Sequence, residues 1–357
     1  MKKLFQLSVV SFLMVMMTIS CSRSFNKPVN DDNVVIYPAP PATTRIQFLT
    51  RISSSSDITG RRSAFARYVL GEDESRSIVK PYGLAIYRGR IYVCDTMLGG
   101  LEIIDLNTRS FDYLKPAGKG QLKKPINCFV DVDGLVYVAD SERGDIVIFD
   151  ENGKFVNSFG SSDIERPTDV FVTDELIWIS DIKSHKILAF SKEDHKLIRS
   201  IPADDENTGE SNLYSPTNLF VKNNQVYVSD FGDFRIKVFS TEGEFLRSIG
   251  SYGKNAGQFV RPKGISVDKQ SNLFVVDAGF ENVQLFNEED QLLMFFGGSY
   301  KGPGDMWLPA KVVIDYDNLE YFRKYVHPGF ELQYLIFVTN QYGPDKINVY
   351  GFVDVKE

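Results

Sequence analysis

The sequence predicts an all-β fold made of tandem units, and two observations carry this prediction. The stretch from Ser215 to Phe239 holds three short apolar runs separated by Asn, Asp and Gly, the pattern of three antiparallel strands. One skeleton also recurs six times along the chain: a proline, an apolar run, and a second apolar run closed by Asp or Asn. The opening prolines are Pro81, Pro125, Pro167, Pro216, Pro262 and Pro309, at spacings of 44, 42, 49, 46 and 47 residues.

A repeat of forty-odd residues built from short strands is typical of a β-propeller, in which each blade buries its faces against its neighbours. The chain has 357 residues, of which 43% are hydrophobic, so it is long enough to bury one large core. We therefore predict a six-bladed propeller of four-stranded antiparallel blades. It is expected to span residues 45–357.

The N-terminal part of this domain is predicted to close the ring. The sixth repeat has apolar runs for three strands, at 310–314, 335–339 and 347–352, and the chain then ends without a fourth. Residues 45–52 have the same alternating, Phe-containing pattern as the runs that end other repeats, for example 245–250. We expect this N-terminal segment to be the outer strand of the last blade, which leaves no unpaired strand edge between the termini.

Residues 1–20 have the composition of a secretory signal that is removed. Lys2 and Lys3 precede an apolar run that extends to Ile19, too short to span a bilayer comfortably, and small residues follow. Residues 21–44 are polar and proline-containing, which predicts an extended, flexible tether.

The segment that ends in Cys21 resembles the bacterial lipobox, although Thr18 stands where Leu is usual. The resemblance implies a lipid-anchored protein of the bacterial cell envelope, attached to the outer membrane through diacylated Cys21 and facing either the periplasm or the exterior. An ordinary signal with an incidental cysteine is the alternative. Acyl chains tether a soluble domain without a membrane-spanning helix.

Two segments depart from the repeat. Phe65, Tyr68 and Val69 recur at helical spacing, which predicts a short helix near residues 60–70 that covers one end of the ring or binds a partner. In the sixth repeat, 31 residues separate the proline from the closing Asn340, where the other repeats have 14 or 15. We expect an insertion near residues 317–333, a place where members of a repeat family differ in partner.

The repeats resemble NHL repeats. The likeness is carried by the opening proline, a hydrophobic residue three positions before it such as Leu213, the Tyr-Val-x-Asp that ends the second strand, and the pattern from Arg235 to Phe239. It implies a six-bladed propeller, a fold that hosts many functions. The repeated Asp recurs once per blade, which favours a structural role. We expect its carboxylate to accept hydrogen bonds from the backbone of the turn that follows.

Metal-dependent enzymes with similar propellers need several metal ligands that meet at one point. The blades are similar to those of peptide-amidating lyases, which hold zinc with several histidines at the channel. Here His185, His195 and His327 fall on a turn, on the opposite end of the same blade, and on another blade, too far apart to share a metal.

Calcium-dependent sugar lactonases, a second similar class, place oxygen ligands at the entry to the innermost strand. The corresponding polar residues here, expected at the channel mouth, are Asn127, Asp169, Asn218 and Lys311. One carboxylate beside a lysine is too little for tight calcium binding. Hydrolase, phosphate-loop and dinucleotide motifs are missing from the sequence, so it predicts no catalytic residue, metal site or cofactor.

Cys94 and Cys128 fall on apolar runs, so they are expected to be buried thiols, with an inter-blade disulfide as the alternative. The formal charge of −7 becomes −9 when Lys2 and Lys3 leave with the signal, which argues against binding of nucleic acid.

Apolar side chains are expected on one face of the ring. The turns after the second strands and the loops between blades fall at the same end, and they carry Met97, Phe231, Phe234, Phe280, Tyr342, Tyr214 and Trp307. Such a cluster indicates a binding face, or else rings tucked under their own loops. The sequence therefore favours a non-catalytic envelope lipoprotein that binds another envelope protein, a surface protein or a small ligand. The alternative is a metal-dependent hydrolase or lyase at the channel mouth.

Overall fold

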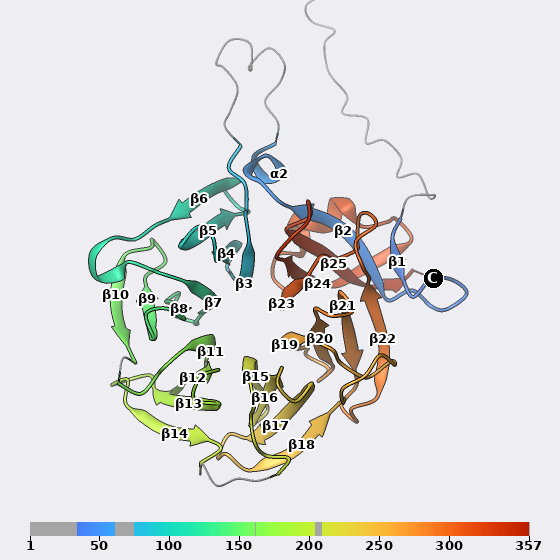
Figure 1. Cartoon of the computed structure of the whole chain (residues 1–357). Helices are drawn as coiled ribbons and strands as arrows, with labels where there is room; N and C mark the ends of the chain where they lie inside the picture. The colour runs from blue at the N-terminus through green and yellow to red at the C-terminus, as the bar shows by residue number, and fades with distance from the viewer. Residues whose placement is uncertain (1–33, 61–74, 161, 204–208, 357) are drawn as a thin grey trace, which may run out of the picture. The chain divides into compact units, whose positions relative to one another are not determined.

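The domain that begins at Val35 is a ring of six antiparallel β-sheets around a central axis (Figure 1). The computed structural model describes residues 34–60, 75–160, 162–203 and 209–356. Each sheet is one blade, and its strands are called a to d from the channel outward. The prediction of a six-bladed propeller is confirmed.

The first three blades follow one another without interruption. Blade 1 contains β3 (Pro81–Tyr87), β4 (Arg90–Asp95), β5 (Gly100–Asp105) and β6 (Ser110–Leu114). After the 3-10 turn η2 (Gly118–Gly120), blade 2 contains β7 (Pro125–Val130), β8 (Val136–Asp140), β9 (Asp145–Phe149) and β10 (Phe155–Phe159). Blade 3 contains β11 (Pro167–Val172), β12 (Leu176–Asp181), β13 (Lys186–Ser191) and β14 (Leu197–Ile201).

The remaining blades complete the circle. Blade 4 contains β15 (Pro216–Lys222), β16 (Gln225–Asp230), β17 (Arg235–Ser240) and β18 (Phe245–Ile249). Blade 5 contains β19 (Pro262–Val267), β20 (Leu273–Asp277), β21 (Asn282–Phe286) and β22 (Leu292–Gly297). Blade 6 contains β23 (Pro309–Asp315), β24 (Phe330–Asn340), β25 (Ile347–Val355) and, from the other end of the chain, β2 (Ile46–Ile52).

The ring is closed as the sequence predicts. Strand β2 pairs antiparallel with β25, so the N-terminal segment is strand d of blade 6. A further strand, β1 (Ile36–Tyr37), pairs with β2 and makes this sheet five-stranded. Residues from Val35 on therefore belong to the domain, whereas the sequence placed all of 21–44 in a tether. The reason is local packing, because the Tyr37 ring contacts Phe296 and its hydroxyl donates to the Gly304 carbonyl.

Four of the five repeated Asp residues fasten their blade to the loop before it and to the turn after it, whereas Asp230 bonds the preceding loop and pairs with Lys237. The Asp140 carboxylate accepts bonds from the backbone N–H groups of Lys123 and Lys124 in the preceding loop, and of Glu142 and Arg143 in the following turn. Asp95, Asp181 and Asp277 do the same. The structural role expected for this residue is confirmed, and it explains why the interblade loops and the b-to-c turns meet at one end of the ring.

The two predicted irregularities have different outcomes. The helix expected near 60–70 lies almost wholly outside the described residues, and the short helix before it is α2 (Ser55–Thr59). The insertion in blade 6 folds as α4 (Leu319–Phe322) and the 3-10 turn η3 (Arg323–Tyr325), but residues 330–333 belong to an extended β24. Among the residues described, no helix has the length and apolar character needed to cross a membrane.

Candidate functional site

The innermost strands all begin with a break in register. In every blade the pairing of strands a and b shifts directly after the opening proline. A bulge of this kind re-aims the side chain that follows it. The residues two positions after the prolines therefore form one layer around the channel axis, and they are Gly83, Asn127, Asp169, Asn218, Gly264 and Lys311. We call this end of the channel the proline end, and the end at the a-to-b turns the hairpin end.

An ion pair crosses the channel in this layer. The Lys311 ammonium of blade 6 lies 2.7 Å from Oδ2 of Asp169 in blade 3. The same oxygen accepts bonds from the Asn218 side-chain amide and the Leu219 backbone N–H, and Oδ1 accepts the N–H of Val170. The carboxylate thus has four donors, three of them uncharged, which is how a buried charge is tolerated.

The proline end is closed by this layer. The side chains of Asn127, Asp169 and Asn218 have no exposed surface, so these residues are buried and do not line the open polar mouth that the sequence suggested. The two glycines of the layer are needed for the same close packing. A Cβ on Gly83 would lie 2.4 Å from the Asn127 Cα, and one on Gly264 would lie 2.5 Å from the Lys311 Cα.

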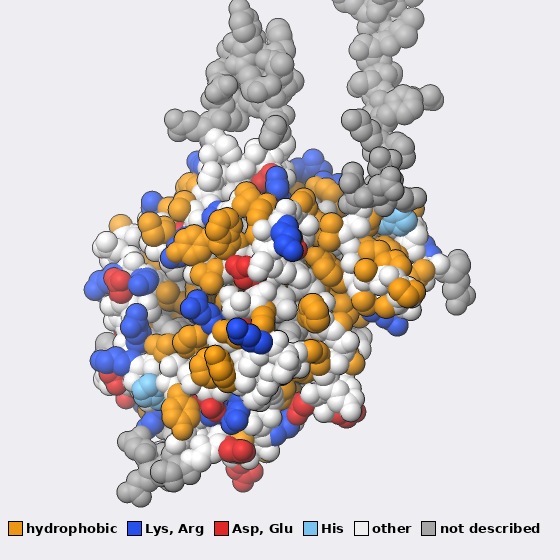
Figure 2. Space-filling model, turned by 45° about the vertical axis from the view of Figure 1, so that its right-hand side comes forward, with side chains coloured by type: hydrophobic (Ala, Val, Ile, Leu, Met, Phe, Trp, Pro, Cys, Tyr) orange, Lys and Arg blue, Asp and Glu red, His pale blue; other side chains and the backbone are white. Residues whose placement is uncertain are grey.

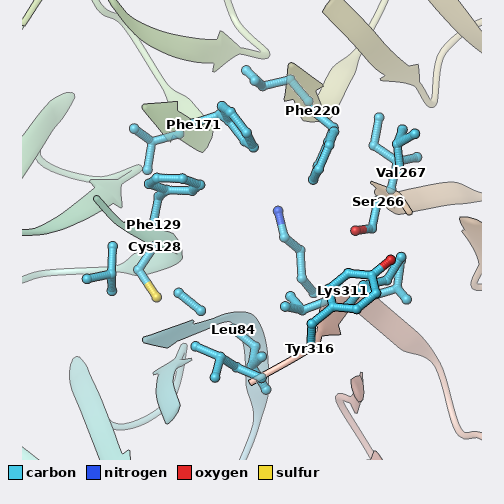
Figure 3. A pocket seen from close by; sticks show the side chains of 18 residues that line it. Leu84, Cys128, Phe129, Phe171, Phe220, Ser266, Val267, Lys311 and Tyr316 are labelled. Carbon is cyan, nitrogen blue, oxygen red and sulfur yellow. The ribbon is translucent and has the colours of Figure 1, made fainter. Parts of the chain in front are cut away.

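Behind the ion pair the channel opens into a cavity of about 320 Å³. Its lining is apolar apart from Lys311, Ser266 and the Tyr316 hydroxyl, and it comes from strand a of all six blades. Figure 3 shows the Lys311 amine directed into the middle of this space. A cavity of this size, with apolar walls and few polar groups, matches the general form of a small-molecule site.

The cavity has an aromatic wall on one side. Phe129, Phe171 and Phe220 occupy the same strand position in blades 2, 3 and 4, and their ring centroids lie 4.6 Å and 4.9 Å apart. The same position in the other blades holds Ala85, Ser266 and Val313, which are smaller. The wall and the small side chains together make an asymmetric pocket, which we call the channel pocket.

The channel pocket is entered from the hairpin end. The three wall phenylalanines and Tyr316 keep part of their surface exposed, whereas the layer at the proline end is buried. Tyr316 begins the blade 6 insertion and is held in place, because its hydroxyl accepts the Lys269 backbone N–H at 2.9 Å and its ring lies 3.9 Å from the Lys269 amine. The entrance is therefore shaped by the segment in which blade 6 departs from the repeat.

The predicted binding face lies at the other end of the ring. Met97, Tyr214, Tyr342 and Trp307 are exposed there, as are parts of Phe231, Phe234 and Phe280. Several of these rings have partners: Phe234 packs between Phe231 and Tyr252, and Trp307 stacks on Tyr300. On the side of the molecule visible in Figure 2, hydrophobic side chains form separate patches among lysine, arginine and acidic side chains.

The histidines are dispersed, as expected. His185 is exposed on a b-to-c turn, and His195 is on a c-to-d turn, where it stacks on Phe159 with centroids 4.5 Å apart. His327 lies in the blade 6 insertion. Among the described residues, no three His, Cys, Asp or Glu side chains are grouped as a metal site requires.

Two buried features lie in blade 1 and at its contact with blade 2. Cys94 and Cys128 are free, buried thiols in one apolar cluster, so the thiol interpretation is confirmed. Glu102 is fully buried on β5 and lies beside Asp95. Burial, together with the charge of nearby Asp95, raises the pKa of Glu102 to about 9, so this carboxyl is neutral at pH 7. The sequence signal for this buried carboxyl was an acidic residue inside the apolar run of residues 101–104.

Comparisons with known proteins support the same fold. A family model described as "6-bladed beta-propeller" matches residues 206–350. No curated protein sequence matches the chain.

Several solved structures resemble this one at low sequence identity. A structural-genomics protein of unknown function from Bacteroides thetaiotaomicron is 15% identical, with a TM-score of 0.60 over 87% of this chain and 76% of that one. A gluconolactonase from Xanthomonas campestris is 14% identical, with a TM-score of 0.57 over 92% and 97%. A streptogramin B lyase is 12% identical, with a TM-score of 0.52 over 76% and 83%. Likeness at such identities establishes the fold alone, and the chain is a six-bladed β-propeller.

Proposed function

We propose that this protein is a non-catalytic binding protein that holds a small apolar molecule in the channel pocket. The single observation that carries the proposal is the pocket itself: about 320 Å³ of largely apolar space, closed at one end and accessible at the other. Burial of apolar ligand surface in such a space contributes about 25 cal/mol per Å² to the free energy of binding, so a ligand with a few rings gains measurable affinity. The domain is proposed to stand in a bacterial envelope, anchored through Cys21, where its partner is this ligand.

The side chains around the pocket support binding rather than chemistry. Asp169, the carboxylate bonded to the pocket lysine, is occupied by four donors, and one of these is the Lys311 ammonium. A general base needs a free lone pair within hydrogen-bond reach of the substrate, and a calcium site needs several anionic oxygens. Neither requirement is met by this pair as it is arranged.

The proposal is tested by titration with N-phenyl-1-naphthylamine, a neutral fluorophore that brightens in apolar sites. Ser266→Phe puts a ring into the pocket and is expected to weaken binding at least tenfold. Phe280→Ser, on the opposite end of the ring, is the matched control and should bind like the parent protein. Circular dichroism establishes that both variants are folded. Equal affinity of parent and Ser266→Phe would refute the proposal.

A metal-dependent hydrolase or lyase is the second candidate, and it has its own test. Protein purified without chelator is analysed for calcium and zinc by mass spectrometry. We expect less than one-tenth of an equivalent of either metal, because the Lys311 ammonium lies where a cation would have to approach Asp169. A stoichiometric metal that survives dialysis, with lactone hydrolysis lost on adding chelator, would establish this candidate instead.

A further inference from the structure

The polar end of the channel pocket indicates what kind of ligand it takes. An ammonium group has three N–H donors. Of the acceptors in the described residues, Asp169 Oδ2 is the one bonded to the Lys311 ammonium, at 2.7 Å. Figure 3 shows the amine within the pocket, among the wall phenylalanines. Two donors are therefore available to a ligand, and a buried donor without an acceptor is costly, so the ligand is expected to present an acceptor there.

The charge balance favours a neutral ligand. Lys311 and Asp169 together carry no net charge, and three uncharged donors further satisfy the carboxylate. A ligand carboxylate would place a second anion beside the ammonium and leave one uncompensated negative charge in an apolar space. A ligand ammonium would face Lys311 directly. A carbonyl oxygen accepts both donors and leaves the balance unchanged.

The body of the ligand is set by the aromatic wall. Phe129, Phe171 and Phe220 form a continuous row of rings that faces the small side chains of Ala85, Ser266 and Val313. Flat, conjugated molecules gain contact with ring faces and edges beyond simple burial of area. The rings are tilted to one another by 48° and 60°, so a flat ligand can meet the face of one ring and the edge of the next.

We propose, on the basis of the binding function above, that the channel pocket selects flat, apolar, uncharged molecules that end in a carbonyl-type acceptor, and that Lys311 donates to this acceptor. Lys311 is then the residue that determines specificity, and Asp169 is the positioning residue that holds the ammonium at the closed end of the pocket. The aromatic wall binds the rest of the molecule with little regard to its end group.

The experiment uses three naphthalenes that differ only at one position: 2-acetylnaphthalene, 2-naphthoate and 2-ethylnaphthalene. Affinities are measured at pH 7.5 by competition with N-phenyl-1-naphthylamine. The ketone is expected to bind about tenfold tighter than the hydrocarbon, the factor of one net hydrogen bond. The carboxylate is expected to bind at least tenfold more weakly than the ketone.

A charge-balanced double variant separates donor chemistry from folding. Lys311→Met with Asp169→Asn removes the ammonium without leaving a buried anion, and it should reduce the ketone-to-hydrocarbon affinity ratio from about ten to about one. The control is Lys263→Met, which removes a nearby ammonium whose bond goes to the Tyr82 hydroxyl at 3.1 Å. This control should leave the ratio at about ten.

The outcomes distinguish this inference from the proposed function. If all three probes compete, Ser266→Phe excludes them, and ketone and hydrocarbon bind equally to the parent protein, the pocket is real but the assignment to Lys311 is overturned. Tightest binding of the naphthoate overturns the charge argument. If no probe competes, or Ser266→Phe changes nothing, the binding function itself is wrong.

Discussion

The Lys311–Asp169 pair predicts a large and specific thermodynamic signature. Lys311→Met removes the ammonium and leaves the Asp169 carboxylate fully buried without its charged partner. Breaking a buried ion pair from one side costs about 3–5 kcal/mol. Because three uncharged donors remain on this carboxylate, we expect the lower limit, a loss of about 3 kcal/mol in the free energy of unfolding.

The double variant, with Asn at 169 as well, should recover most of this loss. No hydrogen-bond partner of the Asn218 side-chain oxygen is found in the part of the chain that the structure describes. If the Asn218 side-chain amide rotates by 180°, this oxygen can accept a hydrogen bond from the NH2 group of the asparagine introduced at position 169. We expect the double variant to lose about 1 kcal/mol, with a coupling energy of at least about 2 kcal/mol from the cycle of four proteins.

Urea unfolding followed by circular dichroism measures all four proteins. Lys263→Met is the matched control, since it removes a partly exposed lysine at the same end of the channel, and it should cost less than about 1 kcal/mol. A cost below about 1 kcal/mol for Lys311→Met, or a double variant as unstable as the sum of the singles, would refute the conclusion that the pair is buried and coupled.

Three further predictions concern the blades. Asp140→Ala leaves four backbone donors without their acceptor and should cost about 3–4 kcal/mol in urea unfolding, against less than about 1 kcal/mol for exposed Asp133→Ala. The pKa of Glu102 is raised to about 9 in the folded protein, from a value near 4.3 in the unfolded chain. The contribution of Glu102 to the free energy of unfolding is therefore greatest below pH 4.3 and is lost as the pH rises toward 9. Glu102→Gln should remove a slope of about 1.4 kcal/mol per pH unit between pH 5.5 and 8.5, and an unchanged slope would contradict the assignment. Cys94 and Cys128 should both react with Ellman's reagent after unfolding without reductant and neither before it; an oxidised pair would contradict their state in the structure.

The repeat made the fold predictable, because each blade carries its own local signals. Three local signals specify each blade: the proline that starts strand a, the alternation within strands, and the Asp that ends strand b. The partners of this Asp lie in the loop before the blade and in the turn after it, all within about 17 residues. Closure by residues 46–52 was predictable for a related reason, since a sixth repeat with three strands requires a fourth from elsewhere. The start of the domain at Val35 was missed, because a two-residue strand has too little pattern to be detected.

The candidate site divides differently between sequence and structure. The polar layer of Asn127, Asp169, Asn218 and Lys311 was selected from its position after the prolines, but its closure was not foreseen. The aromatic wall was missed altogether, although its three phenylalanines occupy one position of the repeat. Within an apolar strand, a ring that faces the channel and a ring that faces the next blade produce the same sequence pattern.

By itself, the sequence determined the number of blades, the direction of their strands and the way in which the ring is joined, because these depend on short-range pattern and on counting. Only the tertiary structure decided that Lys311 of blade 6 reaches Asp169 of blade 3, 142 residues away in the chain, and so closes the channel at one end. The physical reason is that the distance between residues on opposite blades depends on the bulge and twist of every blade between them. Local sequence preferences do not determine this accumulated geometry.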